Sequence, residues 1–125
     1  MATWQEIGQD NFRAGRELYQ RGRYRSSVSR FYYSVFSSLT HELISAGVIF
    51  GEGHEAPTHK ELPKLVNIHL SLATAQKADS IAIIRRVYAT RITADYQRRT
   101  IDEAITREVM RDTAKLFRYL KVEYD

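Results

Sequence analysis

Val28-Ser29-Arg30-Phe31-Tyr32-Tyr33-Ser34-Val35-Phe36 is the stretch that decides the fold of this 125-residue chain. Its large apolar side chains recur at steps of three and four residues, and the pattern continues through Leu39 and Leu43. That spacing places them on one face of an α-helix. We therefore predict a long helix from about Tyr24 to Ala46, which Gly47 ends.

A helix is also predicted immediately before this one. Thr3 and Glu6 have the spacing of a capping box at its start, and Gly22 is a suitable end. Only about three residues join the two helices, so we expect them to run antiparallel. Gly8 and Gly15 would permit close approach between helices, and the many serines of the second helix are read as small packing residues.

Two helices are predicted after the central one, beyond a loop of residues 48–57. Thr58 and Glu61 have the spacing of a second capping box and open a short helix. Pro63 is tolerated only in the first turn, so the helix is expected to start slightly later than the box. A long helix follows over about residues 75–97, where apolar side chains return with helical period.

The last helix is predicted to begin at a third capping box, formed by Thr100 and Glu103, and to run nearly to the C-terminus. Strand-like alternation is almost absent, and a chain with two prolines and six glycines lacks the turns of an all-β fold. The expected fold class is therefore all-α. We predict an up-and-down bundle of four long helices plus one short helix, in a single domain of residues 1–125.

Composition excludes several kinds of protein. The chain has no cysteine, which rules out disulfides, thiolate metal sites and a cysteine nucleophile. No apolar run approaches the roughly 20 residues that a membrane-spanning helix needs. The first residues lack the basic and then apolar plan of a signal peptide. We expect a cytoplasmic protein that is not associated with a membrane.

The positive charge of the chain is carried mainly by arginine, with 14 arginines against five lysines and a net charge of +4. A guanidinium group matches phosphate and carboxylate groups in a bidentate way. Two clusters stand out, namely Arg13, Arg16, Arg21, Arg23, Arg25 and Arg30, and then Arg85, Arg86, Arg91, Arg98 and Arg99. Solvated helix faces and a surface for nucleic acid or nucleotide phosphate both explain such clusters, and composition leaves both open.

The fourth predicted helix ends in Arg91-Ile92-Thr93-Ala94-Asp95-Tyr96, which places two charges where its apolar stripe should continue. An arginine and a carboxylate four residues apart share one helix face. Beside an apolar seam they carry a desolvation cost unless they pair or are used. One interpretation is a salt bridge that fixes packing. The other is a polar groove lined by Tyr96, in which Arg91 and nearby Arg85 or Arg86 meet phosphate.

Two further residues are candidates for that groove. Tyr33 lies about 100° around the helix from Tyr32, so Tyr32 is predicted to be core and Tyr33 to face an interface or a groove. His59, at the opening of the short helix, either points into the groove or stays at the surface as a capping residue. His54 and His59 are five residues apart beside a proline, which is not the i, i+4 helical spacing of a zinc-protease motif. We expect no metal and no cofactor.

The turn and double tyrosine of Gly22–Phe36 occur in this chain together with the Arg-x-x-Ala-Asp-Tyr segment Arg91–Tyr96. With His59 near the start of the short helix, and residues 100–104 opening the last one, they resemble the HEPN family of higher eukaryote and prokaryote nucleotide-binding proteins. The resemblance spans residues 4–120. It implies a compact helical bundle that pairs as a homodimer, often beside a small nucleotidyltransferase that acts as antitoxin.

Many members of that family are metal-independent ribonucleases or toxins. The resemblance implies for them an arginine followed by a histidine about one to two helical turns later, both facing a cleft at the dimer interface. Arg91 matches the arginine, but Tyr96, Gln97 and Arg98 occupy the positions where the histidine would stand. Tyrosine titrates near pH 10, so it is a poor proton shuttle at neutral pH.

We therefore interpret the chain as a nucleotide- or RNA-associated binding module that works with a nucleotidyltransferase partner in a toxin–antitoxin or defence system. In this interpretation Tyr96 either lines the groove or offers its hydroxyl for modification. One alternative is a metal-independent endoribonuclease toxin that uses Arg91 with Tyr96, Asp95 or His59 in place of the missing histidine. A second alternative is a structural helical adaptor, in which the Arg91–Asp95 pair only fixes helix register.

Overall fold

The computed structural model describes residues 1–124, and five α-helices with no strand lie within that range. The helices are α1 (Trp4–Gln20), α2 (Tyr24–Ser45), α3 (Leu62–His69), α4 (Thr74–Tyr96) and α5 (Glu103–Leu120). This confirms the predicted all-α bundle of four long helices and one short one. The boundaries of the long helices lie within about two residues of the predicted ones.

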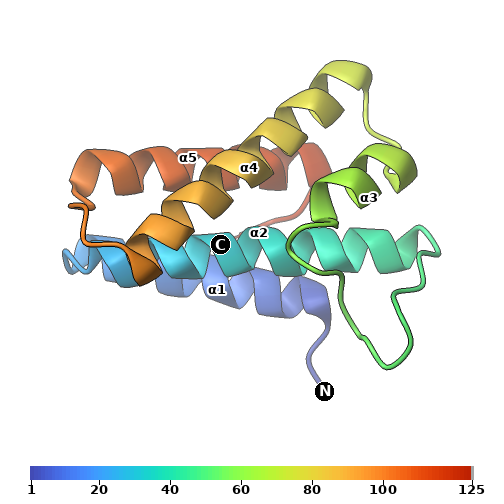
Figure 1. The fold of residues 1–125 in the computed structure, drawn as a ribbon, viewed down its shortest axis with the longest axis horizontal. Coiled ribbons are helices and arrows are strands. Elements are labelled where there is room, and N and C mark those ends of the chain that lie inside the picture. The colour runs from blue at the N-terminus through green and yellow to red at the C-terminus, as the bar shows by residue number, and fades with distance from the viewer. Residues whose placement is uncertain (125) are drawn as a thin grey trace.

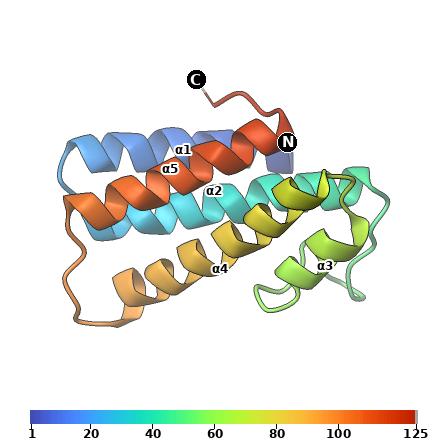
Figure 2. The same cartoon turned by 90° about the horizontal axis from the view of Figure 1, so that it is seen from above.

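The central element is α2, which contacts all four other helices. Figure 1 shows α1 and α2 as an antiparallel hairpin, with α4 crossing over α2 and α5 running alongside. In Figure 2, α5 lies over α1 and α2, whereas α3 and α4 lie along the other side of α2. The chain thereby brings the C-terminal end of α4 to the N-terminal half of α2.

Two glycines of α1 allow it to pack closely against α2, as predicted. Ser34 Oγ donates to the carbonyl of Gly8 at 2.7 Å, and Ser27 Oγ donates to the carbonyl of Gly15 at 2.6 Å. Both serine side chains are fully buried. Ser27 and Ser34 therefore serve helix packing, because both hydroxyls find a backbone acceptor at a point where no Cβ intervenes.

The predicted apolar stripe of α2 forms the centre of the core. Its residues are almost completely buried, namely Val28, Phe31, Tyr32, Val35, Phe36, Leu39 and Leu43. The prediction that Tyr32 belongs to the core is thus confirmed. Apolar side chains from the other helices cover this stripe, including Phe12, Val66, Ile83, Val87 and Phe117.

The short helix starts later than its capping box, as Pro63 requires. Thr58 and Glu61 form both hydrogen bonds of the box, with the Thr58 amide donating to Glu61 Oε1 at 2.7 Å and the Glu61 amide donating to Thr58 Oγ1 at 3.2 Å. These bonds close a turn, and α3 itself begins at Leu62 with Pro63 in its first turn. Proline fits there because a first-turn residue has no helical N–H bond to make.

The predicted capping box of the last helix is wrong. Asp102, and not Thr100, is the N-cap, since its side chain accepts from the Ile105 amide at 2.9 Å. Glu103 turns away from the cap and contacts Arg107 and the Tyr19 hydroxyl. Aspartate is as good an N-cap as threonine, so the position of the connecting chain decides between them.

Candidate functional site

Arg91 is a buried arginine that is fixed by two polar side chains. Only 8% of its surface is exposed. Its Nε donates to Asp95 Oδ2 at 2.8 Å, one turn further along α4. Its Nη2 donates to the Tyr33 hydroxyl of α2 at 2.9 Å. Burial by itself lowers the pKa of Arg91, but Tyr33 and Asp95 outweigh it and the pKa is raised, so the guanidinium stays charged.

Three tyrosine rings surround this guanidinium. The Arg91 Cζ lies 5.4 Å from the ring centre of Tyr32, 5.2 Å from that of Tyr33 and 5.6 Å from that of Tyr96. A cation over an aromatic face gains electrostatic stabilisation that offsets part of its desolvation. From the sequence, an Arg91–Asp95 salt bridge and a polar groove were alternative interpretations. In the structure the ion pair is present, and tyrosine rings and polar side chains surround it.

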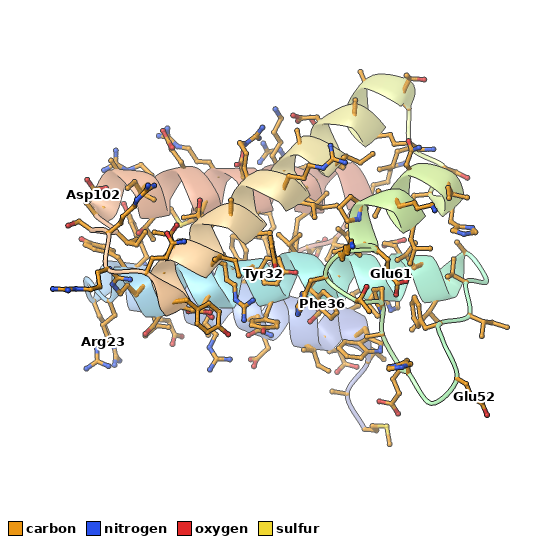
Figure 3. The ribbon with its side chains drawn as sticks, viewed as in Figure 1. Arg23, Tyr32, Phe36, Glu52, Glu61 and Asp102 are labelled. Atoms are coloured by element: carbon orange, nitrogen blue, oxygen red, sulfur yellow. The ribbon has the colours of Figure 1, made fainter. Side chains whose placement is uncertain are left out.

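His59 lies in the same cluster, although it comes from the segment before α3. Its ring packs against those of Tyr32, Tyr33, Phe36 and Tyr88, with centre-to-centre distances of 5.0 to 6.2 Å. Figure 3 shows Tyr32 and Phe36 on α2, between the lower part of α4 and the start of α3 at Glu61. The site therefore contains an arginine and a histidine, with the histidine earlier in the chain than the arginine.

The hydrogen bond between Tyr32 and His59 determines the tautomer of the imidazole. Burial raises the pKa of Tyr32 far above its usual value, so the hydroxyl keeps its proton. Within the described residues its hydrogen-bond partner is His59 Nδ1. We therefore assign the hydroxyl as donor and Nδ1 as acceptor, which leaves the ring proton on Nε2.

The imidazole of His59 is also kept neutral. Burial, and then the charge of Arg91, lower the pKa of His59 below its usual value. At neutral pH the ring is consequently uncharged and presents an N–H donor at Nε2. A ring in this state can hydrogen-bond an anion, but Nε2 lacks the lone pair that a general base needs.

A hollow of about 400 Å³ opens beside Arg91, between the N-terminal half of α2 and the end of α4. Both hydrogen-bond partners of Arg91, Tyr33 and Asp95, line it. Its other lining residues are Arg25, Ser26, Ser29, Arg30 and Ala94. The wall thus combines guanidinium groups, hydroxyls and one carboxylate, which are groups that hydrogen-bond phosphate and sugar.

Two predicted groove residues lie elsewhere on α4. Arg86 makes a bidentate pair with Asp112 of α5, with its Nε and Nη2 donating at 3.1 and 3.0 Å. It lines a separate hollow of about 510 Å³ between α4 and α5. Arg85 is exposed and is not among the residues that line either hollow. The structure therefore gathers Arg91, Asp95, Tyr96, Tyr33 and His59, but not Arg85 or Arg86.

Arg25 and Arg30 of the hollow belong to the first arginine cluster of the sequence but were not assigned to the groove, and Ser26 and Ser29 were read only as packing residues. Ser29 Oγ donates to Asp95 Oδ2 at 3.4 Å, and Arg30 Nη1 donates to Asn11 Oδ1 at 3.3 Å. Arg25 contacts the end of α4. One signal could have placed Arg25 and Ser29 beside Tyr33, because residues 25, 29 and 33 follow at steps of four and so share one face of α2.

Neither a metal centre nor a membrane helix is found within residues 1–124. No group of three or more histidine and carboxylate side chains in this range lies close enough to hold a metal ion. Nor is any helix of the described chain long and apolar enough to cross a membrane.

Comparison with known proteins identifies one family. No curated protein and no solved structure was found to match the chain. The model of the HEPN domain matches residues 1–123, which is nearly the whole sequence. This match includes both segments on which the resemblance rested, and it agrees with the all-α bundle. The chain belongs to the HEPN domain family.

Proposed function

We propose that this chain binds a nucleotide or single-stranded RNA in the hollow between α2 and α4. The observation that carries the proposal is the setting of Arg91, whose buried guanidinium is held by Asp95 and Tyr33, two residues that line the hollow. A charge is retained in a largely apolar bundle only when it is paired or used, and here it is paired at the wall of an open site. Membership of the HEPN family supports a nucleotide- or RNA-related module.

The wall of the hollow offers distinct groups to distinct parts of such a ligand. Arg30 is exposed and can pair with phosphate oxygens through its planar guanidinium. Ser26 and Ser29 place hydroxyls beside it, where they can contact sugar or phosphate. Tyr96 is 71% exposed next to Arg91, so a base can stack on its ring. The ligand would be recognised by charge and stacking more than by base sequence.

The proposal extends to two partners. A second copy of the chain would form a homodimer, as HEPN domains commonly do. A nucleotidyltransferase would act on or with it in a toxin–antitoxin or defence system, and the exposed hydroxyl of Tyr96 is accessible to such an enzyme. Light scattering of the purified chain tests the dimer. Co-purification with the product of a neighbouring nucleotidyltransferase gene tests the partner.

Fluorescence anisotropy with a labelled single-stranded oligouridylate tests the binding site. Arg30→Ala should weaken binding and reduce the slope of log K against log salt by about 0.7, because one phosphate contact on a single strand is lost. Arg118→Ala, in the last turn of α5, removes the same charge outside the hollow and is the matched control. Equal losses in the two variants, or no binding by the wild type to oligouridylate or ATP, would refute the proposal.

A second candidate function is metal-independent cleavage of RNA, which the proximity of His59 to Arg91 favours. Both residues contact the ring of Tyr32. Against it stands the proton assigned to Nε2, since general-base attack needs a free ring nitrogen and the other one, Nδ1, is held by the Tyr32 hydroxyl. Incubating the protein with RNA in EDTA decides the matter. Cleavage by the wild type that His59→Asn abolishes would establish the ribonuclease, whereas intact RNA supports binding alone.

A further inference from the structure

The guanidinium of Arg25 is hydrogen-bonded to the backbone at the C-terminal end of α4. Its Nη1 donates to the carbonyl oxygens of Thr93 at 3.1 Å, Ala94 at 2.9 Å and Gln97 at 2.8 Å. Its Nη2 donates to the carbonyl of Arg99, in the connection to α5. One side chain of α2 therefore holds both the last turn of α4 and the chain that follows it.

The position of Arg25 shows that these contacts outweigh an electrostatic cost. It is the second residue of α2, where a positive charge faces the positive end of that helix's own dipole. The last turn of α4, by contrast, contains no basic residue. The last carbonyls of a helix have no partner within the helix and favour a cation. Arg25 thus caps the end of a neighbouring helix instead of serving its own.

Arg25 makes the first of three contacts that one face of α2 forms with this part of α4. Residues 25, 29 and 33 stand one turn apart. In order along α2, Arg25 contacts the carbonyls, Ser29 donates to Asp95, and Tyr33 accepts from Arg91. Figure 3 shows Arg23, the residue before α2, and Asp102 of the α4–α5 connection at the same end of the bundle. The contact made by Arg25 is thus the terminal one of the series.

We propose that Arg25 is a positioning residue for the ligand site. By fixing the last turn of α4 and the start of the connection against α2, it sets the position of Asp95 in the wall of the hollow and of Tyr96, the next residue of α4. Its effect on ligand affinity rests on the function proposed above, whereas its effect on the end of α4 does not depend on any ligand.

The competing role is a direct contact between Arg25 and ligand phosphate, because Arg25 also lines the hollow. Both of its terminal nitrogens donate to backbone carbonyls, which directs the guanidinium toward α4. The two roles differ in salt dependence. A lost phosphate contact reduces the slope of log K against log salt by about 0.7, whereas a displaced Asp95 and Tyr96 lower affinity without releasing fewer counterions.

Amide hydrogen exchange of the free protein tests the positioning role without any ligand. In Arg25→Ala, amides of residues 93–97 should exchange about tenfold faster or more, because the hydrogen bonds of a charged donor that hold this turn are lost. Arg25→Lys should restore only part of the protection, since an ammonium cannot span the carbonyls of Gln97 and Arg99 as the guanidinium does. Arg23→Ala is the matched control, an exposed arginine two residues earlier whose removal should leave exchange unchanged.

Binding of oligouridylate then tests whether the position of the α4 end affects the affinity for the ligand. Arg25→Ala should bind at least about fivefold more weakly with a wild-type salt slope, and Arg25→Lys should not recover wild-type affinity although it keeps the charge. Unchanged exchange in Arg25→Ala, or a slope reduced as in Arg30→Ala, would overturn the inference. If the wild type does not bind the oligonucleotide, the proposed function fails, and the exchange result alone decides the role of Arg25 in the fold.

Discussion

Arg91 Nη2 donates a hydrogen bond to the hydroxyl of Tyr33 at 2.9 Å, across 58 positions of sequence. This bond joins the two segments that carry the family resemblance, since Tyr33 belongs to Gly22–Phe36 and Arg91 opens Arg91–Tyr96. The segments occur together because they form one contact surface between α2 and α4. Among the described residues the Tyr33 hydroxyl has Arg91 as its hydrogen-bond partner, and without Tyr33 the guanidinium of Arg91 would keep only Asp95.

Tyr33→Phe removes the acceptor of that bond and leaves the ring in place. We expect the free energy of unfolding to fall by about 1 to 3 kcal/mol, because a buried charged donor loses one of its two partners. Urea denaturation measures the loss. Tyr88→Phe is the control, because the hydroxyl of Tyr88 has no hydrogen bond among the described residues, and it should change stability by less than about 0.5 kcal/mol. Equal losses in the two variants would contradict the prediction.

The Arg91–Asp95 pair should respond unequally to the loss of either partner. The side chain of Arg91 is 10% exposed and that of Asp95 is 25% exposed. Asp95→Ala leaves a buried charge with one fewer partner, and we expect a loss of about 2 to 3 kcal/mol. Arg91→Met removes the more deeply buried charge and keeps the volume, so its cost should be about 1 kcal/mol or less.

Thermal or urea unfolding of both variants tests this order, and the reverse order would contradict it. Ligand binding provides a second comparison. Arg91→Met should abolish oligouridylate binding despite its near-normal stability, because the cation beside the hollow is gone. Binding retained by Arg91→Met would show that the pair serves helix packing alone, as the structural adaptor requires.

The fold could be predicted because the positions of the helices depend on local sequence. The period of apolar residues and the breaks at Gly22 and Gly47 are short-range signals, and both glycines have positive φ at the predicted helix ends. The pairing of Arg91 with Asp95 was predictable for the same reason, because one helical turn separates them. The cap of α5 was missed because Thr100 and Asp102 are equally suitable locally, and the tertiary position of the connection chooses Asp102.

The site could be predicted only in part, because its other contacts join distant parts of the chain. Arg86 and Arg91 are both arginines in the second half of α4, yet one turns to Asp112 of α5 and the other to Tyr33 of α2. Arg25 binds backbone carbonyls, which every residue possesses, so its partners leave no pattern in the sequence. Helical period tells which residues share a face, but it does not tell which helix that face meets.

The close contact of α1 with α2 predicts opposite effects at two neighbouring positions. A Cβ at Gly8 would overlap Ser38 Oγ and would lie 3.1 Å from the backbone nitrogen of Ser38. Gly8→Ala should therefore cost about 1 to 3 kcal/mol by forcing the helices apart. Ser38 Oγ is buried with no hydrogen-bond partner in the described chain, so Ser38→Ala should be neutral or stabilise the protein by up to about 1 kcal/mol.

Urea denaturation of the single and double variants tests this pair of effects. The double variant should lose less stability than Gly8→Ala, because removing Oγ relieves the worst overlap and leaves only the backbone contacts. Strictly additive losses would contradict the geometry. So would a substantial loss in Ser38→Ala, since it would reveal a hydrogen bond to this hydroxyl.

The lowered pKa of His59 predicts that the folded protein loses stability in mild acid. Its pKa in the folded chain lies below its usual value, chiefly because of burial and then because of Arg91. As the pH falls below about 6.5, the unfolded chain takes up a proton at this residue while the folded chain does not, so the unfolded state gains stability. The decline should end once the pH is below the folded pKa, where both states are protonated.

The variant His59→Asn isolates this contribution. Asparagine can accept the hydrogen bond of the Tyr32 hydroxyl near the position of Nδ1, but it does not titrate. The difference in unfolding free energy between wild type and variant should therefore change as the pH falls from about 7 to about 5, because the wild type loses more stability over that range. A constant difference across that range would mean that His59 titrates alike in both states, and that burial and the charge of Arg91 do not hold it neutral.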